Sequence, residues 1–410
     1  MMQTRQRTSR RWLATTALAL LAAGVALAMH LSIRGEGYRA DEVHHHTQIR
    51  WLLDGELRRL PNLLMFPLYH MAMAAVAWPF GWTGLDDFRL LNLALSAVAL
   101  SAVSRAARAT CARDAGLRTA QAVALPCLLP LVFLVYTDVA ALGMLAAALF
   151  AVQRRRHRTA AALGFVSILL RQTNAVWVVF LAALALTGER ERGAGDERWP
   201  ATAARAGWPF AAALAGFALL AALVMPALLR PGPPYTSGLY TGNLVFGLAL
   251  LAVLFAPLHA ANSVALFALM RRRPGTVAAA LVATAAAMWL GLRERNALNR
   301  LPDFLHNEVL AAVATGGSAA ALLFVAVAVG LLAVAATPLA PPSRRLLPAA
   351  AALALLPLAV IEPRYSLVPL VLWNLFRAPA TRAVELALVV WNGALSALLW
   401  YAIVEHKLFL

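Results

Sequence analysis

The sequence predicts an all-α, polytopic membrane protein, and two observations support this fold class. First, 61% of the 410 residues are hydrophobic and only 13% are charged. A soluble domain of this length would need more charge to cover its surface. Second, apolar runs recur along the whole chain, which is typical of a protein with several membrane-spanning helices.

The positive charge indicates membrane topology rather than binding to nucleic acid. The net charge is +17, and every positive side chain except Lys407 is an arginine. These arginines fall mainly in short clusters between apolar runs, as the positive-inside rule expects of cytoplasmic loops. The clusters cover residues 5–11, 105–118, 154–158, 190–205, 271–273, 344–345 and 377–382.

The chain begins with a basic cluster and an apolar stretch that ends near Leu31. This pattern resembles a signal peptide, and Ala26-Leu27-Ala28 fits a cleavage site. However, many apolar runs follow, and the stretch is about long enough to cross a bilayer. We therefore interpret residues 11–33 as a retained membrane anchor.

The arginine clusters also order the remaining spans. If all clusters are cytoplasmic, Asp41 lies outside, and a single span separates it from Arg105. The run at 62–80 is interrupted by prolines and carries a histidine, whereas the run at 88–104 is cleaner. We predict a helix on the outer surface at 62–80 and the second span at 88–104. Further spans are predicted at 119–135, 139–152, 159–170, 175–187, 207–229, 243–270, 275–292, 309–336, 347–361, 366–376 and 384–403, about thirteen in total.

This topology predicts two modules and one shared site. Residues 1–205 form an N-terminal catalytic module with a first outer loop at 34–87, and residues 206–410 complete a lipid-donor site. Four polar segments that were not used to build the topology fall on the outer face with Asp41. They are Tyr136-Thr137-Asp138, Arg171-Gln172-Thr173-Asn174, residues 293–308, and Glu362-Pro363-Arg364-Tyr365.

The acidic, histidine-rich segment after the first span is the first candidate for chemistry. Carboxylates beside a membrane are costly to keep there, and a carboxylate is a suitable base for a hydroxyl group. Asp41 and Glu42 are therefore candidate catalytic residues; the alternative is an interfacial loop without such a role. Adjacent side chains diverge, so both are not expected to do the same task, and Asp41 is preferred. His44 is placed to orient Asp41, but the three consecutive histidines lack zinc-type spacing, so no metal is predicted.

Two arginine-bearing segments are candidates for binding phosphate. Arg171 opens a polar interruption within a long apolar run, where polar groups need partners. Its guanidinium matches phosphate oxygens, although a simple turn between two helices is the alternative. Arg364 and Tyr365 suit the same role, with an internal Glu362–Arg364 pair or an interfacial anchor as the alternative. Asp138 is either a second site acid or a helix N-cap.

Motifs for soluble nucleotide chemistry are missing from the sequence. There is neither a Walker-type loop nor a dinucleotide fingerprint, and the predicted cytoplasmic loops are too short to bind a nucleotide sugar. A glycosyl donor would therefore come from the membrane, as a polyprenyl-phosphate sugar with its head group outside.

The order and spacing of these motifs resemble those of the dolichyl-phosphate-glucose-dependent α-1,2-glucosyltransferases, which add the last glucose to the N-glycan precursor. The resemblance covers residues 35–180 well and the C-terminal half more thinly. It implies the GT-C glycosyltransferase architecture, with Asp41 as the base in an inverting transfer from a β-linked donor. It also implies that the donor phosphate and sugar contact Arg171, Gln172, Asn174, Arg364 and Tyr365.

The sequence departs from this family in one segment. The family has an aromatic-rich Asp-Asn-Arg-His-Tyr pattern before a later span, and here only Asp303 and His306 keep that spacing. These two residues, with His44, Asp138 and Glu362, are predicted to support the site or bind the acceptor. The use of arginine in place of lysine, with abundant alanine, suggests the codon bias of a bacterium with a GC-rich genome. A cell-envelope glycan or lipid-linked saccharide is then the expected acceptor.

We thus predict a hexosyltransferase of the bacterial inner membrane with its active site on the periplasmic face. Its partners would be a polyprenyl-phosphate-linked sugar, a glycan or lipid-linked saccharide acceptor and membrane lipids, with no nucleic acid and no cofactor. One alternative is a transporter or flippase for a lipid-linked sugar, which would be expected to show broken helices and an internal repeat. Another is a structural membrane subunit without a reaction of its own.

Overall fold

The computed structural model describes residues 23–60, 63, 65–192, 199–226, 238–291, 296–302 and 304–409. These residues form helices and turns, and strand-type pairing among them is limited to two isolated bridges, Phe304 with Phe409 and Leu339 with Arg377. The all-helical fold predicted from the sequence is therefore observed. The predicted anchor at 11–33 lies partly outside the described residues, and residues 23–31 of it are helical.

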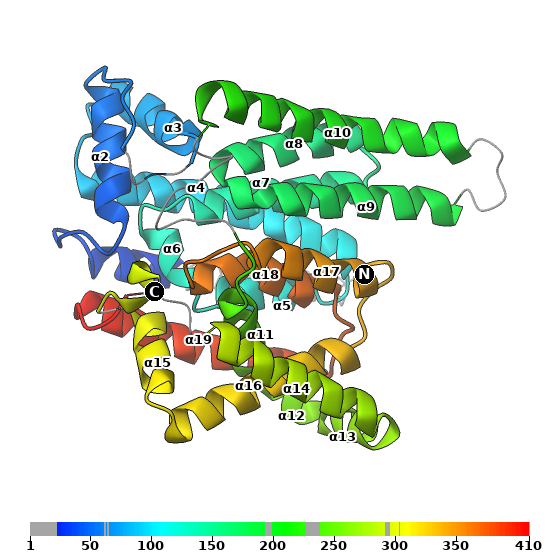
Figure 1. The fold of residues 1–410 in the computed structure, drawn as a ribbon. Coiled ribbons are helices and arrows are strands. Elements are labelled where there is room, and N and C mark those ends of the chain that lie inside the picture. The colour runs from blue at the N-terminus through cyan, green and yellow to red at the C-terminus, as the bar shows by residue number, and fades with distance from the viewer. Residues whose placement is uncertain are drawn as a thin grey trace, which may run out of the picture.

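The N-terminal half contributes a set of helices that lie mostly side by side (Figure 1). They are α2 (Glu42–Leu53), α3 (Leu68–Ala77), α4 (Leu85–Thr110), α5 (Ala115–Val123), α6 (Leu129–Phe133), α7 (Asp138–Gln153), α8 (His157–Leu170), α9 (Ala175–Arg192) and α10 (Trp199–Val224), with the 3₁₀ turns η1 (Trp78–Phe80) and η2 (Gln172–Asn174). Helices α4, α7, α8, α9 and α10 run along a common direction, and α2 and α3 lie at one end of them.

The C-terminal half packs beneath this layer in the view of Figure 1. Its elements are α11 (Gly242–Leu254), α12 (Ala256–Ala261), α13 (Ser263–Arg272), α14 (Pro274–Gly291), η4 (Ala297–Arg300), α15 (Leu305–Ala314), α16 (Gly317–Ala336), α17 (Ser343–Leu355), η5 (Pro363–Ser366), α18 (Leu367–Phe376) and α19 (Arg382–Val404). Helix α15 lies at the same end of the molecule as α2 and α3.

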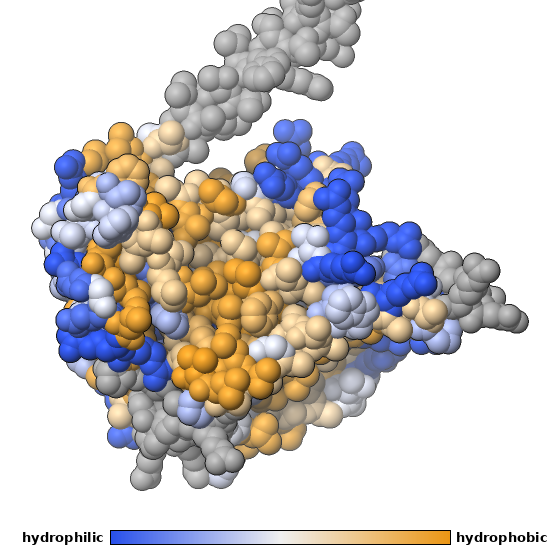
Figure 2. Space-filling model, turned by 90° about the horizontal axis from the view of Figure 1, so that it is seen from above, coloured by the Kyte–Doolittle hydropathy of each residue, from blue (hydrophilic) through white to orange (hydrophobic). Residues whose placement is uncertain are grey.

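Hydrophobic side chains form a band across the middle of one face of the molecule. Figure 2 shows this band between two hydrophilic ends, as expected where a bilayer covers the centre of a helical protein. Among the described residues, five helices are long and apolar enough to cross a membrane: α4, α10 from Pro200 onward, α14, α16 and α19. The predicted count of about thirteen spans is not confirmed, because several of the predicted segments form shorter helices.

Three predicted spans are divided in the structure. The run at 119–135 becomes α5 and α6, with a break that contains Pro126, and the run at 243–270 becomes α11, α12 and α13. Proline lacks the N–H that continues a helix. The run at 309–336 is divided at Gly316 and Gly317, whose φ angles of 80° and 67° favour glycine. Hydropathy alone did not reveal these breaks, because the residues around them are apolar.

The outer-surface helix predicted at 62–80 is shorter than expected. Pro67 precedes α3, which has ten residues and continues into η1. One face of α3 packs on α2 and α4 through Tyr69, His70 and Met73, which are buried. The other face exposes apolar side chains, among them Met71 at 50%.

Two arginines of the predicted cytoplasmic loops are buried rather than exposed. Arg377 donates to Glu385 at 2.6 Å, and Gln121 donates to the same carboxylate at 2.7 Å. Arg118 donates to the main-chain oxygen of Asn374 at 2.7 Å. This network joins α5, α18 and α19 at the end of α18 that is farther from Arg364. Arg118 lies within α5 rather than in a loop, whereas Arg377 lies between α18 and α19 as predicted. Both side chains are buried because each finds a counter-charge or carbonyl groups inside the protein.

Helices α4 and α7 approach closely because α7 has a glycine at their contact. A Cβ atom added at Gly143 would lie 2.6 Å from the Cα atom of Ala99. Backbone atoms cannot move away as a flexible side chain does, so this contact sets the distance between the two helices.

We expect Gly143→Ala to destabilise the protein by about 1–3 kcal/mol through overpacking. The measurement is thermal unfolding in detergent. Gly393→Ala in α19 is the matched control, since no atom lies within 4 Å of its added Cβ. Equal unfolding temperatures for the two variants would contradict the importance of the α4–α7 contact.

Candidate functional site

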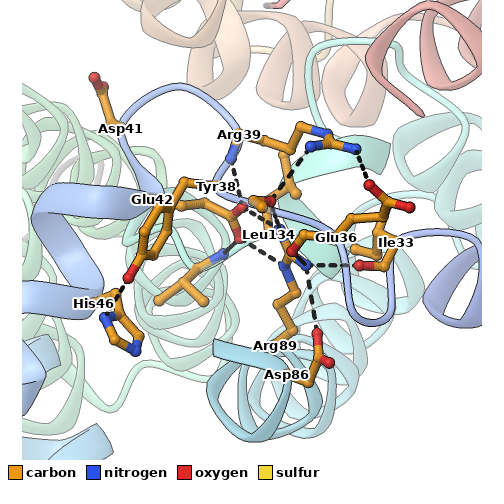
Figure 3. Close-up of polar contacts among 12 residues, drawn as sticks. Ile33, Glu36, Tyr38, Arg39, Asp41, Glu42, His46, Asp86, Arg89 and Leu134 are labelled. Carbon is orange, nitrogen blue, oxygen red and sulfur yellow. Dashed lines mark hydrogen bonds and ion pairs between the residues drawn. The ribbon is translucent and has the colours of Figure 1, made fainter. Parts of the chain in front are cut away.

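The site begins with a buried ion pair that fixes the start of α2. Glu42, the first residue of α2, and Arg89 of α4 are both fully buried. The Arg89 Nη2 and Nε atoms donate to Glu42 Oε2 and Oε1 at 2.6 and 3.1 Å (Figure 3). Main-chain N–H groups of Arg39 and Val135 donate to the same carboxylate at 2.9 and 3.0 Å. Each carboxylate oxygen of Glu42 therefore accepts two hydrogen bonds.

Arg89 also holds the segment that leads into α2. Its Nη1 donates to the main-chain oxygen of Ile33 at 2.7 Å, and its Nη2 donates to that of Gly37 at 2.9 Å. Sequence reasoning did not select Arg89 as a site residue. The candidate Glu42 thus lies in a structural ion pair, and Figure 3 shows its side chain pointing away from that of Asp41.

Asp41 is held on the other side of the helix start. Its main-chain N–H donates to the Tyr136 hydroxyl at 3.0 Å, and its Oδ2 accepts from Arg364 Nη2 at 2.6 Å. Arg364 also donates to Glu362 Oε1 at 2.9 Å. The Asp41 side chain is 37% exposed, more than those of Arg364 and Glu362. Asp41 and the segment that contains Glu362 and Arg364, which the sequence placed on one face, are therefore in contact.

The charge state of Asp41 follows from these neighbours. Burial alone would raise the pKa of its carboxyl group, but the charge and hydrogen bond of Arg364 outweigh burial and lower the pKa below 3.8. Asp41 is therefore ionised at neutral pH, the state that a base requires.

A second carboxylate–guanidinium pair lies beside the first. Arg171, in extended backbone at the end of α8, donates to Asp138 Oδ1 at the start of α7. The Arg171 guanidinium carbon lies 5.3 Å from the centroid of the Tyr365 ring, and the Arg364 guanidinium carbon lies 5.2 Å from that of Tyr136. Asp138 Oδ2 is buried and has no hydrogen-bond partner among the described residues. Asp138 is the first residue of α7 rather than its N-cap.

Asp138, Arg171 and Arg364 line a narrow recess with a volume of about 20 Å³. Asp41 and Glu362 contact Arg364 but are not among the residues that line the recess. The rest of the wall of the recess is mainly apolar, so the charges lie beside a dry surface. The recess is lined by Asp138, Ala141, Leu142, Arg171, Thr173, Asn174, Trp177, Ala354, Leu358, Arg364, Tyr365, Leu367 and Val368.

The polar break after α8 is held by a buried amide. Asn174 donates to the Ser167 hydroxyl at 2.7 Å, and that hydroxyl donates to the main-chain oxygen of Ala141 at 2.9 Å. Asn174 therefore fixes η2 against α7 and α8 and also lines the recess. Gln172 lies in the same turn, is half-buried and is not among the residues that line the recess.

Two buried asparagines position Glu362 and Arg364. Asn243 was not selected from the sequence, whereas Asn299 lies in the polar segment 293–308 that was predicted on the same face. Asn243 of α11 donates to the main-chain oxygen of Val360 at 2.7 Å and accepts from the N–H of Glu362 at 3.0 Å. Asn299 of η4 accepts from the N–H of Ile361 at 2.8 Å. For Asn243, its position in an apolar run was the available signal of a structural role, because a buried amide needs hydrogen-bond partners.

His44 and His306 are not among the residues that line the recess. His44 is half-buried on α2, and its side chain forms no hydrogen bond or ion pair with described residues. His306 is buried in α15, with its ring 5.5 Å from that of Phe304. Asp303 lies outside the described residues. In the described part of the chain, no three His, Cys, Asp or Glu side chains are grouped to hold a metal ion.

Comparison with known proteins adds one finding about the N-terminal part of the chain. Residues 40–220 match the model of the DIE2/ALG10 family. This is a family of glucosyltransferases of the endoplasmic reticulum. The match covers somewhat less than half of the chain and includes Asp41, Asp138 and Arg171 but not Arg364.

No curated protein and no solved structure matches the chain. Together, the family match and the five apolar helices support an integral membrane glycosyltransferase.

We expect Arg89→Ala to destabilise the protein by about 3–5 kcal/mol, because it leaves the Glu42 carboxylate buried without its charge partner. The measurement is thermal unfolding in detergent. Arg113→Ala is the control, since this arginine is exposed in the turn before α5. An Arg89→Ala protein as stable as the control would show that the buried pair does not fix α2.

Proposed function

We propose that the protein transfers a hexose, glucose by its resemblance, from a polyprenyl phosphate to a hydroxyl group of a glycan or lipid-linked saccharide. One observation carries this proposal: the contact between Asp41 and Arg364 joins residues 323 positions apart beside a recess that also contains Arg171. A base and two guanidiniums thus lie within one small region. These are the groups needed to activate a hydroxyl and to stabilise a leaving phosphate.

In the proposed reaction, Asp41 removes the proton of the acceptor hydroxyl while its oxygen attacks the anomeric carbon. The bond between that carbon and the phosphate oxygen breaks on the opposite side, so the configuration inverts. The electron pair leaves with the polyprenyl phosphate, whose charge Arg171 and Arg364 stabilise. The proton remains on Asp41 until it is released to water.

The ion pairs suggest how donor binding prepares the base. Three carboxylates share two guanidiniums, and Asp41 is the most exposed of the three, at 37% against 16% for Glu362 and 3% for Asp138. A donor phosphate that binds Arg364 would displace the most exposed carboxylate. Asp41 would then lose the charge that lowers its pKa and become a stronger base. Glu362 and Asp138 would keep the two guanidiniums oriented.

An apolar groove near the recess suits the lipid part of such a donor. The groove has a volume of about 70 Å³ and is formed by α11, α16, α17 and α18. It is lined by Ser366, two residues from Arg364, and continues along α18 to Trp373. A polyprenyl chain in this groove would place its phosphate close to Arg364. We propose that the recess opens on the periplasmic side, as the arginine-based topology predicts.

We expect Asp41→Asn to reduce transfer at least 10²-fold without unfolding the protein, because Arg364 keeps Glu362 as its partner. The assay follows labelled glucose from polyprenyl-phosphate glucose into lipid-linked saccharides extracted from membranes of the source organism. Asp54→Asn, at the exposed C-terminal end of α2, is the matched control. Near-normal transfer by Asp41→Asn would remove the base assignment.

We expect Arg171→Gln and Arg364→Gln each to weaken binding of polyprenyl-phosphate glucose by about 10- to 100-fold, since a charged hydrogen bond contributes about 1.5–3 kcal/mol. Equilibrium binding of the labelled donor to protein in detergent measures this effect. The control is Arg154→Gln, at the far end of α7. Unchanged donor affinity in both recess variants would place the phosphate elsewhere.

A further inference from the structure

A buried pair of histidines, which the proposed reaction does not use, joins α2 to α3 beside Asp41. His45 Nδ1 lies 2.9 Å from His70 Nε2, and the two rings are stacked with centroids 5.2 Å apart and planes at 15°. Both side chains are at least 98% buried. A hydrogen bond in such a dry place is costly to lose, so it ties the two helices together.

The geometry also indicates how the protons are arranged. His70 Nδ1 is buried and has no hydrogen-bond partner among the described residues. An unpaired N–H group is rarer in protein interiors than an unpaired acceptor. This favours the tautomer in which His70 Nδ1 is unprotonated. His70 then donates from Nε2, and His45 accepts at Nδ1. Burial lowers the pKa of His45 to about 4 and that of His70 well below 6.5, so the pair is neutral at neutral pH.

The histidine pair reaches Asp41 through Tyr136. The His45 ring lies 5.4 Å from the Tyr136 ring. The Tyr136 hydroxyl accepts from the N–H of Asp41, and its ring faces the guanidinium of Arg364. Tyr136 therefore touches both members of the Asp41–Arg364 pair, and His45 packs against Tyr136.

A second contact from α3 supports the chain just before Tyr136. The Tyr69 hydroxyl donates to Asn92 Oδ1 at 2.9 Å. The Asn92 amide donates to the main-chain oxygens of Leu131, Val132 and Leu134 at 3.1, 3.1 and 2.7 Å. Neighbouring residues of α3 thus hold Tyr136 from two directions. The opposite face of α3 carries exposed apolar side chains, as expected of a helix at a membrane surface.

We propose that α3 is a positioning element for the base: His70, through His45 and Tyr136, sets the place of the Asp41 carboxylate relative to Arg364. This proposal rests on the proposed function, because it concerns the same carboxylate. Neither histidine is proposed to contact a substrate, so both are positioning residues rather than catalytic ones. A misplacement of about 1 Å is enough to reduce a rate by about 10²-fold.

The test compares His70→Leu, which removes the hydrogen bond, with His70→Gln, whose amide nitrogen takes a place similar to that of Nε2. Transfer from polyprenyl-phosphate glucose is measured at several donor concentrations, with thermal unfolding measured in parallel. We expect His70→Leu to lower kcat about 10- to 100-fold with little change in the KM for the donor. His70→Gln should restore most of kcat. Met71→Leu, on the exposed face of α3, should behave as the unmodified protein.

Two further variants keep the proposal falsifiable if His70→Leu does not fold. Tyr136→Phe removes only the hydroxyl that binds the Asp41 N–H, and His45→Asn keeps an acceptor near the place of Nδ1. We expect Tyr136→Phe to lower kcat and His45→Asn to retain most of it. Normal kcat in Tyr136→Phe, or equal kcat in His70→Leu and His70→Gln, would overturn the proposal.

The control with Asp41→Asn separates this inference from the proposed function. If Asp41→Asn is inactive while the α3 and Tyr136 variants have normal kcat, the positioning role is wrong and the base assignment stands. If Asp41→Asn transfers glucose normally, the base assignment fails and the positioning role fails with it, whereas the proposed hexose transfer stands. If the unmodified protein transfers no hexose, the proposed function fails.

Discussion

The Glu42–Arg89 ion pair is the interaction on which the rest of the site depends. Both groups are fully buried, and charges in such a place are tolerated only when their hydrogen-bonding positions are filled. This requirement brings the loop before α2, the start of α4 and the chain at Val135 to one point. Asp41, the residue before Glu42, is consequently held at the edge of the recess with nearly fixed main-chain geometry.

Next to the start of α2, the site consists of alternating negative and positive side chains from distant parts of the chain. Asp138 and Arg171 come from the N-terminal helices, and Glu362 and Arg364 from the C-terminal half. Asp41 connects the two halves through Arg364. Each guanidinium has a counter-charge beside an apolar wall, where electrostatic interactions are stronger than in water. The same wall would strengthen the attraction between these arginines and a lipid-linked phosphate.

The layer behind these charges is neutral and tightly hydrogen-bonded. His45 with His70, Tyr136, and the asparagines of α4, α11 and η4 all use their polar atoms to hold main chain or rings in place. Such support fixes the charged groups without adding charge of its own. The described structure therefore separates the groups proposed to contact substrate from those that keep them oriented.

The sequence by itself determined the helical class, the approximate position of most helices and the set of polar interruptions, because apolar runs and the residues that break them are local properties. The sequence indicated that Asp41 and Glu42 have different roles and favoured Asp41 as the base. Only the tertiary structure decided that Asp41 contacts Arg364 while Glu42 is buried against Arg89, since these partners are far away in the chain. The divided helices at Pro126 and Gly316, and the burial of Arg118 and Arg377, were likewise decided by packing. Whether a charge lies in a loop or inside the protein depends on the segments that meet it, and those segments are far away in the chain.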